Sequence, residues 1–155
     1  MSNSGISKDE ALSKLQRYCA YQERCHQEVR NKLIGLKVYG DDLEDVISSL
    51  ISEGFLNEER YARAYVRGKS RIKRWGKMKI RTQLKAKQIS EYCIRKGFEE
   101  LEEIQNRENI LHWIQKVEKD YGNLEPYLLK RKTIQYLNNK GFSFEEIQKI
   151  GGLED

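Results

Sequence analysis

The feature that most constrains the fold is a short pattern that appears three times along the chain. The copies read VRNKL at 29–33, IRTQL at 80–84 and TIQYL at 133–137, so they recur after 51 and then 53 residues. A longer helical pattern precedes each copy, and a shorter, separately capped one follows it. Such a period is typical of tandem units that each bury a small core and lean on the next. We predict an all-α fold of three tandem three-helix repeats in an elongated, curved helical array.

Apolar residues recur at helical spacing along most of the chain, and no stretch has the alternation of a strand. The clearest stripe runs from Leu43 to Ile51 and ends at Gly54, which suits a left-handed cap. The chain contains a single proline, Pro126, at a position that suits a first helical turn. Helices are expected over about 8–22, 24–35, 41–53, 57–74, 77–87, 90–101, 106–121, 126–140 and 143–150.

Polar residues with the right spacing mark most of the predicted helix starts. A capping box, in which Glu follows a hydroxyl or carboxyl side chain by three residues, is expected where the first, third and ninth helices begin. Asparagine or serine is expected to cap the fourth, sixth and seventh helices. The predicted pairs and caps are Ser7 with Glu10, Asp41 with Glu44, Ser143 with Glu146, Asn57, Ser90 and Asn106.

These starts and stops divide the chain into four predicted segments. Residues 1–6 are small and polar and are expected to be disordered. The three-helix repeats are expected at 7–56, 57–105 and 106–152. The repeat rests on pattern rather than on identity, because the three copies have diverged widely.

One stretch, residues 67–87, is strongly basic: ten of its 21 residues are Lys or Arg, and none is acidic. The whole chain carries a net charge of +5. A run of this density creates a positive field that attracts a nucleic-acid backbone or acidic protein patches. The predicted contacts to nucleic acid or to a protein–DNA filament are Arg67, Lys69, Arg71, Lys73, Arg74, Trp75, Lys77, Lys79, Arg81, Lys85 and Lys87.

Apolar side chains interrupt the basic run, so it is expected to fold rather than to extend as a solvated tail. Ile72, Ile80 and Leu84 are expected to pack inward. Trp75 has two interpretations: it stacks on a base, as aromatic residues do in single-strand sites, or it fills the seam between the fourth and fifth helices. Farther along, Glu99, Glu100, Glu102, Glu103 and Glu108 either meet basic loops of a partner or keep the protein in solution.

The sequence offers no pattern for catalysis, metal binding or a cofactor. Cys19, Cys25 and Cys93 lack CxxC spacing and are expected to be reduced thiols. Gly68-Lys69-Ser70 imitates the end of a P-loop but lies in a helical pattern. No apolar run approaches the ~20 residues of a membrane span, so we expect a cytoplasmic protein that contacts no membrane.

Several motifs resemble those of the RecX family. The segment from Gly54 to Ala62, GFLNEERYA, matches that family's signature of a glycine, a hydrophobic pair, Asn or Asp, acidic residues and Arg-aromatic-Ala. Gly76 with Ile80 and Leu84, Ser90 with Ile94, and residues 140–144 with Ile147 match its later repeats. The resemblance covers residues 12–150. Two positions depart from it: Gln88 stands where glycine is more usual, and Thr133 stands where an aliphatic residue is usual.

The resemblance implies a non-enzymatic modulator of the RecA recombinase. Members of the family are tandem three-helix proteins that bind in the groove of the RecA–single-stranded-DNA filament and damp its ATPase and strand-exchange activities. The implied partners are therefore the RecA filament and single-stranded DNA, with duplex DNA as a weaker partner, and the chain is expected to act as a monomer. The implied role is to restrain recombination and so to regulate DNA repair.

A different class also fits the basic run: a stand-alone helical DNA-binding module or helix-turn-helix transcription regulator with Lys77–Lys87 as its recognition helix. That helix has few side chains suited to base edges and many simple cations, which position a protein on DNA rather than specify a sequence.

Overall fold

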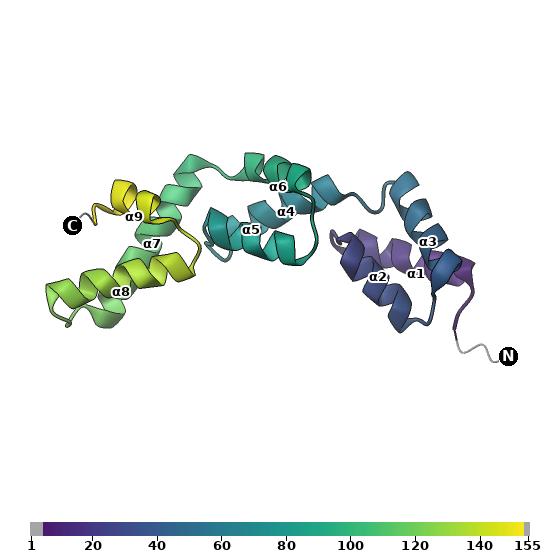
Figure 1. Ribbon diagram of the computed structural model, residues 1–155, viewed down its shortest axis with the longest axis horizontal. Helices are drawn as coiled ribbons and strands as arrows, with labels where there is room; N and C mark the ends of the chain where they lie inside the picture. The colour runs from purple at the N-terminus through teal and green to yellow at the C-terminus, as the bar shows by residue number, and fades with distance from the viewer. Residues whose placement is uncertain (1–4, 154–155) are drawn as a thin grey trace.

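The computed structural model describes residues 5–153, and over that range every regular element is helical (Figure 1). The predicted all-α class is confirmed, and the helices follow one another in an elongated, gently curved array of three-helix units. The elements are α1 (Lys8–Tyr21), α2 (His26–Gly35), α3 (Gly40–Ser52), α4 (Glu58–Arg71), α5 (Lys77–Ala86), α6 (Glu91–Gly97), the 3-10 turn η1 (Phe98–Glu100), α7 (Glu103–Tyr121), α8 (Pro126–Asn139) and α9 (Phe144–Gly151).

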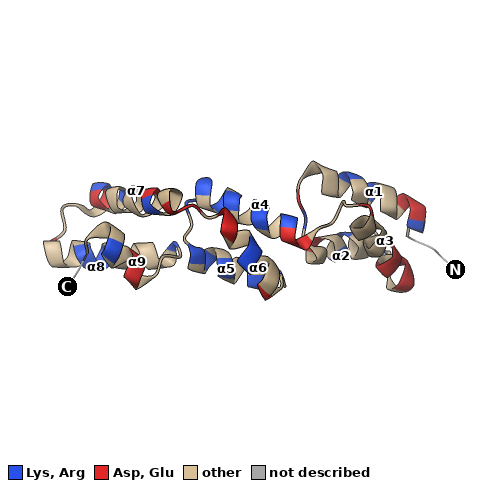
Figure 2. Ribbon diagram, turned by 90° about the horizontal axis from the view of Figure 1, so that it is seen from above, with Lys and Arg blue, Asp and Glu red and all other residues tan. Residues whose placement is uncertain are grey.

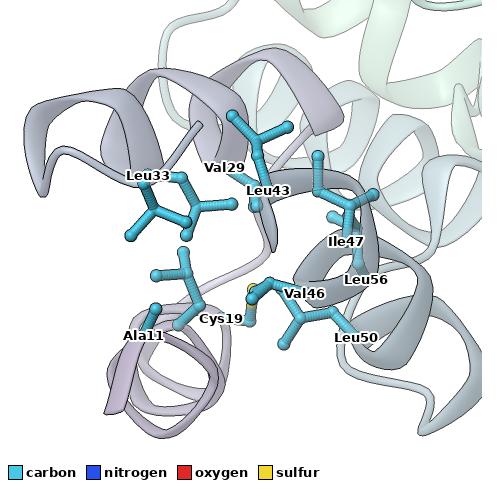
Figure 3. Packing of buried hydrophobic residues seen from close by; sticks show 11 residues of the cluster. Ala11, Cys19, Val29, Leu33, Leu43, Val46, Ile47, Leu50 and Leu56 are labelled. Atoms are coloured by element: carbon cyan, nitrogen blue, oxygen red, sulfur yellow. The ribbon is translucent and has the colours of Figure 1, made fainter. Parts of the chain in front are cut away.

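The array has three separate hydrophobic cores. The first lies among α1, α2 and α3, where Leu15, Leu33 and Leu50 are fully buried (Figure 3). The second is built around Ile80, Leu84 and Ile94, and the third around Ile110, Leu137, Phe142 and Ile147. No core is large, so each unit depends on its neighbours for part of its stability.

The N-terminal prediction falls largely on residues outside the described range. Residues 1–4 are not described, whereas Ile6 is partly buried against the first core. The described part of that segment therefore joins the first unit.

The predicted caps are largely confirmed. Ser7, Asn57, Ser90 and Ser143 each accept a hydrogen bond from the backbone N–H three residues on, at 2.8–3.2 Å. Of the predicted boxes, the one at Ser143 is reciprocal, with the carboxylate of Glu146 accepting the backbone N–H of Ser143 at 2.9 Å. A box that the sequence did not predict, Cys25 with Glu28, begins α2. Gly54, as predicted, has a positive φ of 81°.

Two predicted helix starts are wrong. The third helix begins at Gly40 without a side-chain cap, and the carboxylate of Glu44 binds the guanidinium of Arg30 at 2.9 Å instead. The seventh helix begins at Glu103 rather than at Asn106. In the first case an ion pair between helices competes successfully for the carboxylate that would have completed the box.

The same turn follows the middle helix of every unit. Lys37, Gln88 and Gly141 have φ values of 63°, 62° and 103°. The next residue is buried each time, and its backbone N–H donates to the carbonyl of the last core leucine of the helix, at 2.9–3.1 Å. These buried residues are Val38, Ile89 and Phe142, and the leucines are Leu33, Leu84 and Leu137.

The second and third units are joined backbone to backbone. The N–H of Gly76 donates to the carbonyl of Lys140 at 2.8 Å, and the N–H of Met78 donates to the carbonyl of Gly141 at 2.9 Å. The first turn of α5 therefore finds its hydrogen-bond acceptors in the turn after α8. A Cβ atom at Gly76 would lie 2.5 Å from the carbonyl oxygen of Gly141, so this approach requires glycine.

Candidate polyanion-binding surface

Helix α4 divides the predicted basic run into two faces. Arg63, Arg67 and Arg71 follow one another at intervals of four residues and share one stripe of the helix. Lys69 lies about 200° around the helix from Arg67, because each residue turns the chain by about 100°. The run is therefore not one continuous ribbon of charge, and its two faces have different surroundings.

The arginine stripe is neutralised within the molecule. Arg63 contacts Glu99 and Glu100, both at 2.9 Å, and Arg67 contacts Glu100 at 3.0 Å. Arg71 contacts Glu102 at 3.0 Å and Arg63 also contacts Glu59 at 3.1 Å. We call these residues the arginine–glutamate network: Arg63, Arg67, Arg71, Glu59, Glu99, Glu100 and Glu102.

The network changes the interpretation of the acidic cluster. Three of its five carboxylates, Glu99, Glu100 and Glu102, have partners inside the protein. Hydrogen bonds from Arg63 lower the pKa of Glu99, and hydrogen bonds from Arg67 and Arg63 lower the pKa of Glu100. These ion pairs link η1 and the residues after it to α4, so an outside partner would have to compete with the arginines for them.

Helix α5 is also partly neutralised. Arg81 contacts the carboxylate of Glu91 at 2.8 Å, and the ammonium group of Lys85 lies 3.6 Å from the same carboxylate. Lys77 and Arg81 lie over the ring of Phe98, at 5.0 and 5.5 Å from its centroid. The predicted recognition helix thus directs two of its cations toward α6.

The opposite group of cations has no acidic partner. Among residues 5–153, the side chains of Lys69, Lys73, Lys79 and Lys140 make no ion pair within 4.0 Å. We call these four residues the lysine face. Figure 2 shows basic positions along α4 and α5 near the middle of the molecule. Lys140 comes from the turn after α8 and is brought to α5 by the Gly76–Lys140 hydrogen bond.

Repulsion within the lysine face is visible in the pKa of Lys140. Partial burial lowers that pKa, and the charges of Lys79, Lys116 and Lys73 lower it further. Lys116 itself has a partner, because it contacts Asp120 at 2.9 Å. A cluster of like charges without counter-ions attracts an anion, and an anion bound there would relieve the repulsion.

Aromatic rings support the lysine face. The ammonium groups of Lys69 and Lys79 lie 5.1 and 4.6 Å from the ring centroid of Trp75, and that of Lys140 lies 4.3 Å from the centroid of Trp113. Trp75 is half-buried and packs against the second core, which is the predicted seam position. Its ring nevertheless borders the lysine face, so the two interpretations of this residue are compatible.

Arg74 has a structural role that the sequence did not indicate. Its φ is 56°, its guanidinium donates to the side chain of Asn109 at 3.2 Å, and its carbonyl accepts the indole N–H of Trp113 at 2.8 Å. Asn109 is fully buried and also donates to the carbonyl of Ser70 at 2.7 Å. Arg74 therefore fastens the end of α4 to α7.

The expectation that Ile72 packs inward is wrong. Helix α4 ends at Arg71, and the side chain of Ile72 is 80% exposed. The chain turns there to reach Trp75, whose N–H donates to the carbonyl of Lys69. Ile80 and Leu84, in contrast, are fully buried as predicted.

The predicted site residues thus fall into three groups. Sequence reasoning did not include Lys140, although the recurrence of the third unit and its Lys140-Gly141 pair were available as a signal. The groups are cations paired with carboxylates (Arg67, Arg71, Arg81, Lys85), residues that pack or fasten units (Arg74, Trp75), and lysines without a carboxylate partner in the described chain (Lys69, Lys73, Lys77, Lys79, Lys87).

Features of other site classes are accounted for by the fold. In residues 5–153, no group of three His, Cys, Asp or Glu side chains is placed to hold a metal ion. The cysteines are free and buried, and the P-loop-like segment lies inside α4, where Ser70 is buried. None of the described helices has the length and apolar character needed to cross a membrane.

The fold and this surface define a class: a tandem three-helix repeat protein with an unneutralised lysine face at the junction of two units. The family description "RecX, second three-helix domain" matches residues 57–97, and "RecX, third three-helix domain" matches residues 103–150. The chain belongs to the RecX family.

Proteins of known sequence and structure agree with this assignment. The chain is 30% identical over 131 residues to the regulatory protein RecX of Bacillus mycoides (strain KBAB4), covering 84% of this chain and 48% of that protein. It is 31% identical, with the same coverage, to the regulatory protein RecX of Bacillus cytotoxicus. The chain thus spans about half the length of the curated relatives it matches.

Solved structures share the whole array. The crystal structure of RecX from Lactobacillus salivarius aligns with a TM-score of 0.83 and 25% identity, covering 94% of each chain. A second crystal structure, of a regulatory protein RecX, aligns with a TM-score of 0.86 at 24% identity, covering 94% of this chain and 73% of that one. The order and relative placement of the helices are therefore common to these proteins.

Proposed function

We propose that this protein is a non-enzymatic regulator that binds the RecA filament on single-stranded DNA. It lodges in the filament groove, damps ATP hydrolysis and strand exchange, and so restrains recombination and DNA repair. Membership of the RecX family supports the regulatory role, and the curated relatives are named regulatory proteins. The elongated array suits a groove, because modest contacts repeated along a polymer add up to avidity.

The observation that carries the DNA part of the proposal is the lysine face. Its four cations come from two units and have no acidic partner in residues 5–153, so their charge is available to phosphates. Each phosphate neutralised on a single strand releases counter-ions, which makes binding fall with salt by about 0.7 log units per log unit of salt. The arginine–glutamate network contributes less, because a phosphate would first have to displace a carboxylate.

The alternative of a sequence-reading DNA-binding module has less support. Arg81 and Lys85 of α5 are directed toward Glu91, and Lys77 lies over Phe98. A recognition helix must present such side chains to base edges in the major groove. Tight, sequence-selective duplex binding with a shallow salt slope would favour this alternative.

The proposal also covers organisation and location. We propose that residues 7–56, 57–105 and 106–152 act as the three repeat units and that the chain acts as a monomer in the cytoplasm, without a membrane contact or a cofactor. One hydrophobic core per unit supports the division. Cys25 belongs to the second core although it lies in the first unit, which ties those two units together.

The test is a RecA ATPase assay on single-stranded DNA with this protein titrated in. We expect inhibition at ratios below one molecule per recombinase, and we expect the double variant Lys79→Gln/Lys140→Gln to inhibit less. The matched control Lys14→Gln/Lys119→Gln removes the same charge from exposed positions outside the lysine face. Absence of inhibition by the unaltered protein would overturn the filament proposal, and equal inhibition by both variants would overturn the role of the lysine face.

A further inference from the structure

A hollow lies between the first and second units, lined by residues of the α1–α2 turn and of α2, α4 and α5. Figure 1 shows the first and second units side by side in the array. Its volume is about 510 Å³, which is within the range of small-ligand sites. The residues that matter for its chemistry are Glu28, Tyr65, Lys69, Trp75, Gln83 and Lys87.

Two half-buried aromatic rings give the hollow its apolar surface. Tyr65 lies beside the buried ring of Tyr61, with centroids 5.8 Å apart, and Trp75 packs against the same core. The ammonium group of Lys69 lies 5.3 Å from the centroid of Tyr65 and 5.1 Å from that of Trp75. One ammonium group thus lies over both rings, so a ligand that stacks on them must displace it.

The polar groups around these rings are not fully used by the protein. The Oε1 atom of Glu28 accepts the backbone N–H of Cys25 at 2.9 Å, and among residues 5–153 the carboxylate forms no ion pair within 4.0 Å. Within the described chain, the amide of Gln83 makes no side-chain hydrogen bond, and Lys87 has no carboxylate within 4.0 Å. An amide and a carboxylate match the donors and acceptors on a base edge, and two lysines match a phosphate.

This combination distinguishes between two kinds of occupant. Glu23 also lines the hollow, but its carboxylate is paired with Arg60 at 2.6 Å. Lys69 and Lys87 then outweigh the single carboxylate of Glu28, and this balance disfavours a cationic side chain of a protein partner. A nucleotide uses all three kinds of group: its base stacks on aromatic faces, its edge meets the polar side chains, and its phosphate meets the lysines. A base stack is worth more than an exposed cation–π contact, so a base displaces the ammonium of Lys69 from the rings toward the phosphate.

We propose that this hollow is a base pocket that takes one unstacked nucleotide of a single strand. The base lies against Tyr65 and Trp75, its edge meets Gln83 and Glu28, and the flanking phosphates meet Lys69 and Lys87. Lys69 belongs to the lysine face and Trp75 borders it, so the strand continues from the pocket toward Lys79 and Lys140. The assignment rests on the proposed contact with single-stranded DNA and adds to it a site that reads the presence of a base.

The first test compares a short oligothymidylate with an abasic oligonucleotide of the same length and charge, using the full chain. The abasic strand keeps every phosphate and lacks the bases. We expect it to bind roughly 5- to 150-fold more weakly, the contribution of one aromatic stack. Equal affinity for the two strands would overturn the pocket and leave only phosphate binding.

The second test identifies the pocket residues. Replacing one base of the strand by fluorescent 2-aminopurine reports stacking, and we expect quenching on binding that is lost in Trp75→Leu and reduced in Gln83→Ala. The control Gln135→Ala changes an exposed glutamine of α8 and should leave the quenching intact. Circular dichroism of Trp75→Leu checks that this variant folds. Gln83→Ala tests the pocket independently, because Gln83 does not belong to the second core. Unchanged quenching in both variants would overturn the proposal. Binding of a basic peptide in the hollow in place of the strand would also overturn it.

These outcomes are separable from failure of the regulatory proposal. If the protein inhibits RecA but binds abasic and normal strands equally, the pocket fails and the regulatory role stands. If the pocket binds a base but the ATPase is not inhibited, the pocket stands and the regulatory role fails.

Discussion

The N–H of Gly76 donates to the carbonyl of Lys140 across 2.8 Å, and with the neighbouring bond from Met78 to Gly141 this hydrogen bond links the two halves of the lysine face. Gly76 is the N-cap of α5, which carries Lys79, and Lys140 is the C-cap of α8, where the following turn begins. The hydrogen bond joins segments 64 residues apart, at positions 76 and 140 of the chain. Whatever separates the units at this point therefore also separates Lys79 from Lys140.

Gly76→Ala should loosen the joint and lower stability. The added Cβ would lie 2.5 Å from the carbonyl oxygen of Gly141 and 2.7 Å from the ring of Phe142, so backbone must move. We expect a loss of roughly 1–3 kcal/mol in the free energy of unfolding, measured by urea denaturation. The control is Gly68→Ala inside α4, where a Cβ meets no atom within 4 Å. It should stabilise by roughly 0.5–1 kcal/mol, and a loss at both positions would contradict the steric explanation.

Gln88→Gly should stabilise the second unit. Gln88 has a φ of 62° at the position where the third unit has Gly141. A non-glycine residue there costs roughly 1–2 kcal/mol. Glycine removes that cost but increases the conformational entropy of the unfolded chain, so we expect a net gain of about 0.5 kcal/mol in the free energy of unfolding. Thermal unfolding measures it.

A helical control shows whether the gain comes from the backbone angle. Gln135→Gly introduces glycine at an exposed position inside α8, where the backbone is already relaxed. It should destabilise by about 1 kcal/mol. A similar loss of stability in Gln88→Gly would show that the positive φ of Gln88 does not destabilise the protein.

The arginine–glutamate network should make stability fall in acid. Arg63 and Arg67 lower the pKa values of Glu99 and Glu100, so these carboxylates bind protons less readily in the folded state than in the unfolded state. Their contribution is present above the unfolded pKa, near 4.3, and is lost as the pH falls through the lower folded values. We expect the Tm difference between the unaltered protein and Glu100→Gln to shrink as the pH falls from 7 toward 3.

Glu108→Gln is the comparison for that titration, because Glu108 is exposed and forms no ion pair among the described residues. Its Tm should differ little from that of the unaltered protein at any pH. A constant Tm difference for Glu100→Gln across the range would mean that the carboxylate acts through packing rather than charge.

Periodicity and capping predicted the architecture because they are local signals. Ser143 with Glu146 and Asn57 act within one helix turn, and the sequence shows both partners together. The predicted capping box of Asp41 with Glu44 was wrong for a reason that no local pattern contains, because Arg30 of another helix binds the carboxylate of Glu44. The prediction that Ile72 packs inward was wrong because α4 ends at Arg71, one residue before it.

The candidate site was predictable in composition but not in arrangement. Ten cations among residues 67–87 are visible in the sequence, yet the partners of the arginine stripe lie about thirty residues away, as Glu100 does for Arg67. The sequence therefore could not show that the arginine stripe is neutralised and that the lysines are not. Lys140 was missed because it reaches the lysine face through backbone hydrogen bonds between two units, Gly76–Lys140 and Met78–Gly141.

Lys140→Met should raise stability and weaken DNA binding at the same time. The pKa of Lys140 is lowered by burial and by the charges of Lys79, Lys116 and Lys73, so its proton is bound more weakly in the folded state. Removing the charge should add roughly 0.5 kcal/mol, and methionine keeps an apolar chain beside Trp113. The stability gain should disappear at alkaline pH, because the unaltered protein gains stability as Lys140 loses its proton.

The same variant should lose one phosphate contact, so its salt slope on single-stranded DNA should fall by about 0.7. Fluorescence anisotropy across a salt series measures the slope, and thermal unfolding at neutral and alkaline pH measures stability. Lys119→Met, at an exposed position of α7 without an ion pair in the described chain, should change neither. A lower Tm for Lys140→Met would show that the contact of its ammonium with Trp113, at 4.3 Å, outweighs the repulsion within the lysine face.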